Sequence, residues 1–231
     1  MRNLLSTKDQ RQLRLMETLI QHRDWLKLHE LADKLGCTER ILKSDLNELR
    51  LAFSSIDIQS SVNGIMIDLE VNTSVEDVYQ YFLAHSQSFQ LLEYMFFNEG
   101  LPIYRTIENL HSSNANLYRL GRNITKILSS QFQIELSFTP SEIRGNEIDI
   151  RYFFAQYFSE RYYFLDWPFP DLPEEDLTEF ADFFYKITNY PMRFSIYRMY
   201  KLMIAISIYR VKNGHFIDLP NHFYDKYYPL L

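Results

Sequence analysis

Apolar residues near the start of the chain recur at the spacing of an amphipathic helix. Leu13, Met16 and Ile20 lie three or four positions apart. This spacing predicts a helix over residues 7–22. A second short helix with its own apolar positions follows and ends before Gly36, a residue type that commonly terminates helices. The chain is therefore expected to begin with two helices.

The stretch CTERILKSDLNELR, residues 37–50, predicts a third helix with one apolar and one polar face. Leu42, Leu46 and Leu49 are spaced i, i+4 and i+7, which places them on one side of a helix. Thr38 precedes them and is of the type that caps helix starts. The opposite side carries polar and charged residues. It is either an ordinary solvated surface or a surface that binds a partner.

A two-stranded hairpin is predicted directly after this helix. Ile65, Ile67 and Leu69 alternate with outward positions, and Asn63-Gly64 is a dipeptide typical of tight turns. Three helices, of which the last two are joined by a turn of about three residues, followed by a hairpin, are the element order of a winged helix-turn-helix domain. In that fold the third helix is the recognition helix.

The same element order returns further along the chain. Two helices are predicted over residues 74–97, a short one over residues 103–110, a long one in SSNANLYRLGRNITKIL from Ser112, and a second hairpin over residues 134–145. Apolar positions also repeat at one constant offset, in the pairs Leu35 and Leu110, Leu42 and Leu117, and Leu49 and Ile124. This internal repeat predicts a second winged helix-turn-helix domain.

A further helix is predicted after the second hairpin. It begins at Asn146 and Asp149, which are residues of capping type. Its predicted apolar stripe consists of Ile148, Tyr152, Ala155 and Phe158. Pro168, Pro170 and Pro173 then exclude a regular helix or a central strand. A domain boundary is therefore predicted shortly before these prolines.

Two helices are predicted beyond this boundary. The first begins at Asp171 with Glu174 and extends to about Asn189. The second begins at Pro191 and ends at Asn213-Gly214. The predicted fold class is mainly α, with tandem winged helix-turn-helix domains, each with a small β-hairpin wing, and an all-helical segment. The predicted domains are residues 1–72, 73–165 and 166–231.

Composition and charge limit the functions that the chain can have. Cys37 is the single cysteine, and the start lacks the apolar run of a secretory signal, so a cytoplasmic protein without a membrane partner is expected. The net charge is −6, and none of the three predicted domains has an excess of basic residues. Because Lys and Arg supply much of the affinity for phosphate groups, any contact with DNA must be local.

The polar face of the first predicted recognition helix supplies one set of candidate DNA contacts. Its members are Arg40, Lys43, Ser44 and Asn47. The alternative is a solvated polar face, which is usual on surface helices. Glu39, Asp45 and Glu48 balance the three bases of the same helix. This helix is therefore predicted to contribute register more than affinity.

The second predicted recognition helix has no acidic residue between Ser112 and Gln131. Its candidate DNA contacts are Ser113, Asn114, Asn116, Tyr118, Arg119, Arg122, Asn123 and Lys126. Arginine can bind guanine edges or phosphates, and asparagine can pair with adenine. A solvated basic face is again the alternative. On this charge pattern the second helix is predicted to supply more of the affinity.

Part of the first recognition helix resembles a known group of regulators. TERILKSDLNEL from Thr38 resembles the recognition helix of the DeoR, BglG and Mga winged-helix groups, whose pattern is roughly S-x-R-T-I-x-R-D-L-x-x-L. The residues in register are Arg40, Leu42, Asp45, Leu46 and Leu49. Thr38, Ile41 and Ser44 replace the Ser, Thr and second Arg of the pattern. One basic contact of the pattern is therefore missing.

A second resemblance is more distinctive. RGNEIDIRYFFAQYFSERY from Arg144, WPF at Trp167 and LYRLGRNI from Leu117 are similar to the second winged helix of Mga-type regulators. The chain is therefore identified as a member of the Mga family (M-protein trans-acting positive regulator) of Gram-positive bacteria. The resemblance implies two winged helices, then two regulation domains of the sugar phosphotransferase system (PTS) and a IIB-like domain, with this chain ending inside the first regulation domain.

The resemblance also implies partners. These are double-stranded DNA, a second copy of the chain and PTS phosphotransfer proteins, in a regulator that activates transcription. The sequence holds no catalytic motif and no Cys/His cluster of metal-binding spacing, so neither enzymatic activity nor a cofactor or metal is expected. The alternative function is a protein-interaction or dimerisation module built on winged-helix scaffolds.

Phosphorylation of the regulation segment, residues 166–231, is expected to be restricted. In related regulation domains a histidine lies on the helix before an R-x-K-x-G-like end, which here is formed around Gly214. Met203 stands where that histidine is expected. His215 is therefore the remaining candidate for phosphorylation, and both it and His222 are otherwise expected to be ordinary loop histidines.

Overall fold

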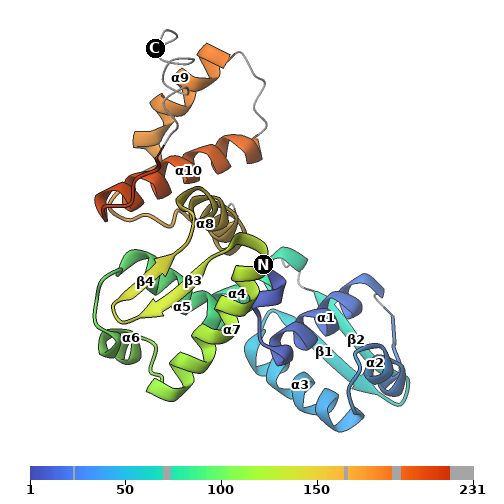
Figure 1. Cartoon of the computed structure of the whole chain (residues 1–231). Helices are drawn as coiled ribbons and strands as arrows, with labels where there is room; N and C mark the ends of the chain where they lie inside the picture. Colours follow the sequence, from blue (N-terminus) through green and yellow to red (C-terminus); the bar gives the residue numbers. More distant parts are fainter. Residues whose placement is uncertain (23, 70–73, 164–165, 189–193, 219–231) are drawn as a thin grey trace. The chain divides into compact units, whose positions relative to one another are not determined.

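The structure is a computed structural model that describes residues 1–22, 24–69, 74–163, 166–188 and 194–218. It contains two compact units, Met1–Gln90 and Leu91–Leu231. Most of the described residues are helical, and two small antiparallel hairpins complete them (Figure 1). The predicted fold class, mainly α with hairpin wings and a helical carboxy-terminal segment, is confirmed.

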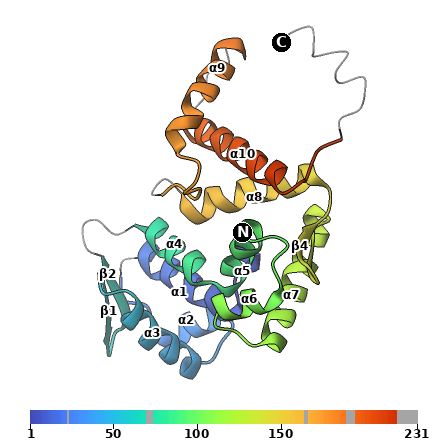
Figure 2. The ribbon, with the colours of Figure 1, turned by 90° about the vertical axis from the view of Figure 1, so that its left-hand side faces the viewer.

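The first unit contains the three predicted helices and the hairpin, followed by one more helix. Its elements are η1 (Arg2–Leu4), α1 (Thr7–His22), α2 (Leu28–Lys34), α3 (Glu39–Ala52), β1 (Ile56–Ser61), β2 (Gly64–Leu69) and α4 (Val75–His85). α1 has the predicted bounds, and the amide of Asp9 donates a hydrogen bond to Ser6 Oγ at 3.1 Å. The helices α1, α2 and α3 lie close together beside the hairpin (Figure 2).

α3 packs on a buried leucine face, as its spacing predicts. Leu42, Leu46 and Leu49 are only 0%, 2% and 1% exposed. The amide of Ile41 donates to Thr38 Oγ1 at 3.3 Å, which caps the helix start. Burial of the three leucines fixes the rotation of α3 about its axis. The polar side of the helix therefore points away from the core.

The first hairpin forms with a different turn from the one expected. Ser61 pairs with Gly64, so Gly64 is already the first residue of β2 and carries the positive φ of 130°. A Cβ atom on Gly64 would lie 2.1 Å from the carbonyl oxygen of Leu26. Leu26 pairs with Ile65 through two backbone hydrogen bonds of 2.9 and 2.8 Å. The glycine is thus required by the close approach of a third chain segment, as well as by its φ.

The second unit repeats the arrangement and adds the helical segment. Its elements are α5 (Gln87–Phe97), which begins in the first unit, α6 (Ile103–Asn109), α7 (Asn114–Phe132), β3 (Glu135–Phe138), β4 (Ser141–Arg144), α8 (Glu147–Tyr162), η2 (Glu174–Leu177), α9 (Thr178–Thr188) and α10 (Phe194–Lys212). β3 and β4 form the second hairpin, and α10 packs against α8. The predicted second wing is therefore present.

The internal repeat extends to the limits of the helices. α6 starts and ends at the same offset from α2 that the apolar pairs show, and α7 starts at this offset from α3. The turn residue with positive φ is Gly36 (63°) in the first copy and His111 (46°) in the second. Their amides donate to the carbonyls of Asp33 and Glu108 at 3.1 and 3.3 Å. Residues related by the repeat therefore occupy equivalent positions on the two recognition helices.

The predicted apolar stripe of α8 is wrong in part. Ile148 and Tyr152 are 55% and 52% exposed, although the stripe predicts that both face the core. The buried residues are instead Ile150, Arg151, Phe153, Phe154, Ala155, Tyr157 and Phe158. α8 packs against α10 and also contacts α7 and β4. Because neighbours cover more than one side of α8, its buried residues do not follow a single helical stripe.

The carboxy-terminal segment starts differently from the prediction. The 3-10 turn η2 follows Pro173 without a side-chain cap, so the predicted cap at Asp171 is wrong. Glu174 instead forms an ion pair with Lys201 of α10 at 2.6 Å. α10 ends where predicted, because Gly214 has a φ of 86°. The predicted helix limits at Asn189 and Pro191, like His222, lie outside the described residues.

Replacement of Gly64 by alanine is expected to destabilise the first wing. The added Cβ would collide with the backbone at Leu26 and also strain the backbone of β2, at a cost of roughly 2–4 kcal/mol in urea denaturation. Gly36→Ala is the matched control, because it has positive φ but nothing within 4 Å of its Cβ position. It should cost about 1 kcal/mol. Equal costs for the two variants would contradict the close-approach explanation.

Candidate nucleic-acid interface

The outward face of α3 collects the predicted DNA contacts of the first domain. Arg40, Lys43, Ser44 and Asn47 are all exposed. At 3.6 residues per turn, they fall within an arc of about 100° that lies opposite the buried leucines. Among the described residues, Arg40 has no hydrogen-bonding or ion-pairing partner. The sequence prediction for this face is therefore supported by geometry, although DNA contact itself stays a prediction.

The predicted charge balance of α3 is wrong, because two of its three acids do not lie on the outward face. Asp45 is 1% exposed and accepts hydrogen bonds from Arg11 Nε at 2.6 Å and Gln12 Nε2 at 3.0 Å. Glu48 pairs with Lys8 at 2.5 Å, and hydrogen bonds from Lys8 and Gln12 lower the pKa of Glu48. Both acids thus bind α1 and do not oppose the bases of the recognition face.

Glu39 is the acid that remains close to the interface. Its carboxylate lies 3.9 Å from Lys43 Nζ, and both side chains are at least half exposed. Such an exposed pair within one helix is weak and screened by salt. The face of α3 therefore has a positive balance from Arg40 and Lys43 against Glu39, which the count over the whole helix concealed.

Arg50 borders the candidate interface and is absent from the contacts that the sequence predicted. Its guanidinium donates to the Ile58 carbonyl at 2.9 Å, to Ser60 Oγ at 2.5 Å and to Asn47 Oδ1 at 3.1 Å. It therefore connects α3 with strand β1 of the wing and also orients a candidate base contact. A groove between α3 and the hairpin is lined by Lys43, Asn47, Arg50, Ser60 and Ser61, among others. Residue spacing carries no signal for this contact, because Arg50 and its strand partners are joined only by folding.

The outward face of α7 carries the basic residues of the second domain. Tyr118, Arg119, Arg122, Asn123 and Lys126 are exposed, as is Asn114 at the start of the helix. Arg119, Arg122 and Lys126 fall within an arc of about 60°. Through the internal repeat, Tyr118, Arg119 and Arg122 occupy the positions of Lys43, Ser44 and Asn47. Each recognition helix thus exposes residues at equivalent positions of its own domain.

Two of the predicted contacts on α7 also form hydrogen bonds at the helix start. Ser113 Oγ accepts a hydrogen bond from the Asn116 amide at 3.2 Å and is the N-cap. Asn116 is half-buried, donates through Nδ2 to Ser112 Oγ at 2.9 Å, and accepts from Arg119 Nη2 at 2.7 Å. Their side chains are already engaged locally. We therefore expect Ser113 and Asn116 to act as capping groups before they act as base contacts.

The second wing packs directly on α7. Gly121 lies inside the helix, and a Cβ atom there would lie 2.3 Å from the ring of Phe138 in β3. Tyr118 meets the same ring edge-on at 5.2 Å between centroids. Tyr118 therefore supports the wing with one edge while remaining 38% exposed. This packing fixes the wing close to the basic face of α7.

His215 lies in a cluster of buried charges. Its Nε2 atom is 2.8 Å from Glu99, which also pairs with Arg210 at 2.9 Å. Arg210 binds Glu147 as well, at 2.8 Å. Burial would raise the pKa of Glu147, but hydrogen bonds from Arg210 and Arg151 outweigh this effect and lower it. His215 thus contacts an ion-pair cluster through Glu99, and its phosphorylation stays a prediction.

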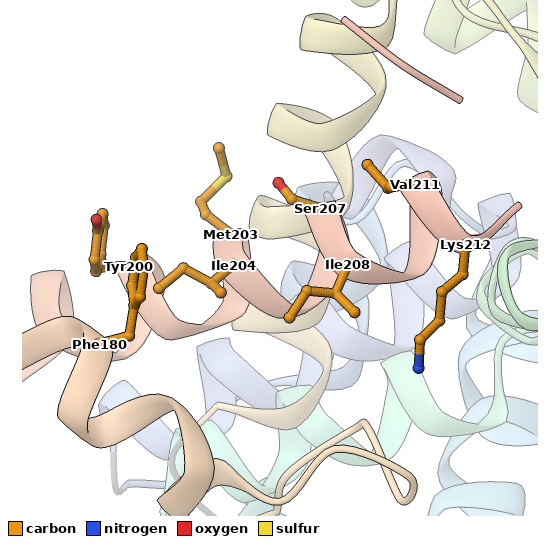
Figure 3. Close-up of a pocket in the computed structure, with 8 residues that line it drawn as sticks. All are labelled: Phe180, Tyr200, Met203, Ile204, Ser207, Ile208, Val211 and Lys212. Carbon is orange, nitrogen blue, oxygen red and sulfur yellow. The ribbon is translucent and has the colours of Figure 1, made fainter. Parts of the chain in front are cut away.

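Met203 does not lie in the charged cluster around His215; it lines an apolar groove of α9 and α10 (Figure 3). Phe180 comes from α9, and the other residues drawn come from α10; the lining is Phe180, Tyr200, Met203, Ile204, Ser207, Ile208, Val211 and Lys212.

The described residues contain no group of three or more His, Cys, Asp or Glu side chains placed to hold a metal ion. None of the described helices has the length and apolar character needed to cross a membrane.

Three family models match consecutive parts of the chain. Residues 6–65 match the HTH domain of the M protein trans-acting positive regulator (MGA), and residues 71–158 match the Mga helix-turn-helix domain. Residues 173–231 match the MGA PRD domain, where PRD denotes the PTS regulation domain. This chain belongs to the Mga family. The membership of the Mga family that the sequence predicted is therefore confirmed.

Two relatives of this Mga-family chain agree with the assignment. A trans-acting regulator of Streptococcus pneumoniae serotype 4 is 46% identical over 219 residues, which cover 95% of the chain and 44% of the relative. The capsule synthesis positive regulator AcpA of Bacillus anthracis is 24% identical over 211 residues, covering 89% of the chain and 43% of AcpA. The chain spans less than half the length of either relative.

Asp45 and Glu39 of this Mga-family chain are expected to respond differently to removal of their charge. Asp45→Asn should destabilise the fold by about 2–3 kcal/mol in urea denaturation, because it leaves a buried partner unpaired. Glu39→Gln should change stability by less than about 0.5 kcal/mol. It should nevertheless strengthen DNA binding, since it removes a negative charge from the recognition face. The assignment of roles would be refuted by a stable Asp45→Asn protein or by Glu39→Gln weakening DNA binding.

Proposed function

We propose that this chain is the DNA-binding part of an Mga-type transcription regulator. It would bind DNA through two winged helix-turn-helix domains, whose recognition helices are α3 and α7. The observation that carries the proposal is the repeated outward face: α3 and α7 bury apolar residues at equivalent positions, and each exposes polar and basic side chains on its outward face. Phosphate contacts from such faces would supply affinity, and contacts to base edges would supply specificity. The names of both relatives describe regulators and support the same function. The name of AcpA, a positive regulator, favours activation.

The proposed contacts are divided between phosphate and base. The proposed contacts to phosphate or guanine are Arg40 and Lys43 of α3 and Arg119, Arg122 and Lys126 of α7. The proposed polar contacts to bases or sugars are Ser44, Asn47, Asn114, Tyr118 and Asn123. Ser113 and Asn116 are kept in a supporting role, because both engage in the helix cap. The wings would contact the flanking backbone.

Three domains, residues 1–72, 73–165 and 166–231, remain the proposed division of the chain. The matched ranges 6–65 and 173–231 fall inside the first and third of these. The third domain would connect DNA binding to sugar supply through PTS phosphotransfer proteins, and a second copy of the chain would assemble with the first. DNA binding of this kind takes place in the cytoplasm of bacteria.

A protein-interaction module is the second candidate function, and two observations favour it. The net charge of −6 opposes binding to a polyanion. The apolar groove on α9 and α10 is a surface that a protein segment could cover. If this candidate holds, the chain should assemble with a protein partner and show no affinity for DNA even at low salt.

Gel-shift titration separates the two candidate functions. Random-sequence and curved A-tract duplexes are titrated at two salt concentrations, and we expect a shift at low salt that weakens as salt rises. Arg119→Ala with Arg122→Ala should reduce the magnitude of the salt slope by about 1.8 if both residues contact phosphate. If one of them binds a guanine edge instead, specificity at one base pair should fall, at a cost of about 1–3 kcal/mol.

Arg40→Ala with Lys43→Ala is the matched pair in the first domain. We expect a smaller loss of affinity from this pair, because Glu39 remains on that face while α7 has no acid between Ser112 and Gln131. The difference should be smaller than the whole-helix charge count predicts, since Asp45 and Glu48 bind α1. Absence of any shift at low salt would refute the proposal. Equal losses from the two pairs would refute the unequal division between the domains.

A further inference from the structure

The end of α10 is joined to the second winged helix by buried charge. Arg210 is 1% exposed, although its side chain is charged and long. Its Nη1 atom lies 2.9 Å from Glu99 Oε2, and its Nη2 atom lies 2.8 Å from Glu147 Oε2. The Nε atom also donates to Glu147 Oε1 at 3.1 Å. One residue of the regulation segment therefore binds two carboxylates, one that follows α5 and one in the first turn of α8.

Glu99 carries the connection from Arg210 to the wing. Its Oε1 atom accepts a hydrogen bond from the Ile143 amide of β4 at 3.1 Å, while its Oε2 atom binds Arg210. The next residue, Gly100, donates its own amide to the Ser141 carbonyl at 2.7 Å. Glu99 and Gly100 thus both bind the backbone of β4. The Glu99 carboxylate, which accepts the hydrogen bond from Ile143, is oriented by Arg210.

The remaining partners close the cluster. Arg151 of α8 donates from Nε to Glu147 Oε1 at 2.8 Å and from Nη2 to the His215 carbonyl at 3.0 Å. His215 Nε2 lies 2.8 Å from Glu99 Oε2. The chain after α10 therefore contacts Glu99 directly and Glu147 through Arg151. Each charged group in this cluster has an oppositely charged partner.

Stability alone is a weak explanation for this arrangement. A buried ion pair contributes little compared with apolar residues of the same volume, because both charges lose their hydration. Its distinctive property is geometric, since a guanidinium binds carboxylates only in a narrow range of orientations. A shift of α10 would therefore move or release Glu99. The hydrogen bond from Ile143 would then lose its acceptor.

We infer that Arg210 of the regulation segment is a positioning residue for the second winged helix: through Glu99 it holds strand β4, so that DNA binding by α7 and its wing depends on where α10 lies. The effect on DNA rests on the proposed function. The connection from Arg210 through Glu99 to Ile143 does not rest on the proposed function, because it consists of contacts within the second unit. Coupling of this kind requires one element that can take two arrangements, with α10 and the DNA-binding face each stabilising one of them more than the other. Here the element is β4, and the hydrogen bond from Ile143 to Glu99 reports which arrangement is present.

Arg210→Lys tests the inference with the charge retained. Lysine cannot bind both carboxylates in the same geometry, so Glu99 should lose its fixed orientation. The Ile143 amide should exchange with solvent about tenfold faster or more, because a hydrogen bond to a charged acceptor is lost. Affinity for DNA should fall in the same variant, while the salt slope should stay unchanged because no phosphate contact is removed. Hydrogen exchange followed by NMR and gel-shift titration measure the two effects.

Arg198→Lys is the matched control on the same helix. Arg198 is also buried, at 7% exposure, and pairs with Glu174 and with the Asp166 carbonyl. It has no contact with the wing among the described residues. This control should leave the exchange of the Ile143 amide and the DNA affinity unchanged. Any general loosening of the helical segment would affect both variants alike.

The outcomes separate this inference from the proposed function. Unchanged exchange at Ile143 in Arg210→Lys, or equal acceleration in Arg198→Lys, would overturn the positioning role. Should Arg210→Lys fail to fold, Glu99→Gln replaces it with the same expectations, since it keeps the size of the side chain and removes its charge. If the unaltered chain binds no duplex, DNA binding fails as a function. The exchange experiment then still decides whether Arg210 positions the wing.

Discussion

Burial of an apolar stripe on each recognition helix determines which side chains remain available for a partner. Leu42, Leu46 and Leu49 on α3 are almost fully buried, and a helix with three such contacts cannot rotate about its axis without exposing them. Leu117, Ile124 and Leu128 do the same for α7. The positive-φ turns before both helices then set where each recognition helix begins. The chemistry of the outward faces varies freely on this fixed support.

The sequence predicted the elements whose cause is local. The leucine spacing, the cap at Thr38, the bounds of α1 and the glycine after α10 each depend on residues within a few positions of one another. The internal repeat was also visible, because apolar positions recur at a constant distance along the chain. For these features, knowledge of tertiary contacts was not needed.

The features that the sequence did not predict depend on distant partners. Asp45 looked like a surface acid, yet its partner Arg11 lies 34 residues earlier on another helix. Gly64 looked like a turn residue, yet the approach of Leu26 is what excludes a Cβ atom. Ile148 belonged to the predicted apolar stripe of α8, yet its side chain is exposed, because the neighbours of α8 cover other sides of the helix. In each case a packing neighbour, rather than helix or strand periodicity, decides the role of the residue. The same limit hid Arg50 and Arg210.

The equivalent positions of the two recognition helices have different side chains, which gives the chain a polarity. Lys43, Ser44 and Asn47 correspond to Tyr118, Arg119 and Arg122. A regulator that binds as two identical copies suits a palindromic site, in which both half-sites are the same. A single chain that used both of its faces would instead prefer two unlike half-sites. Such a target has no two-fold symmetry, and the bound protein would therefore point in one direction along the duplex.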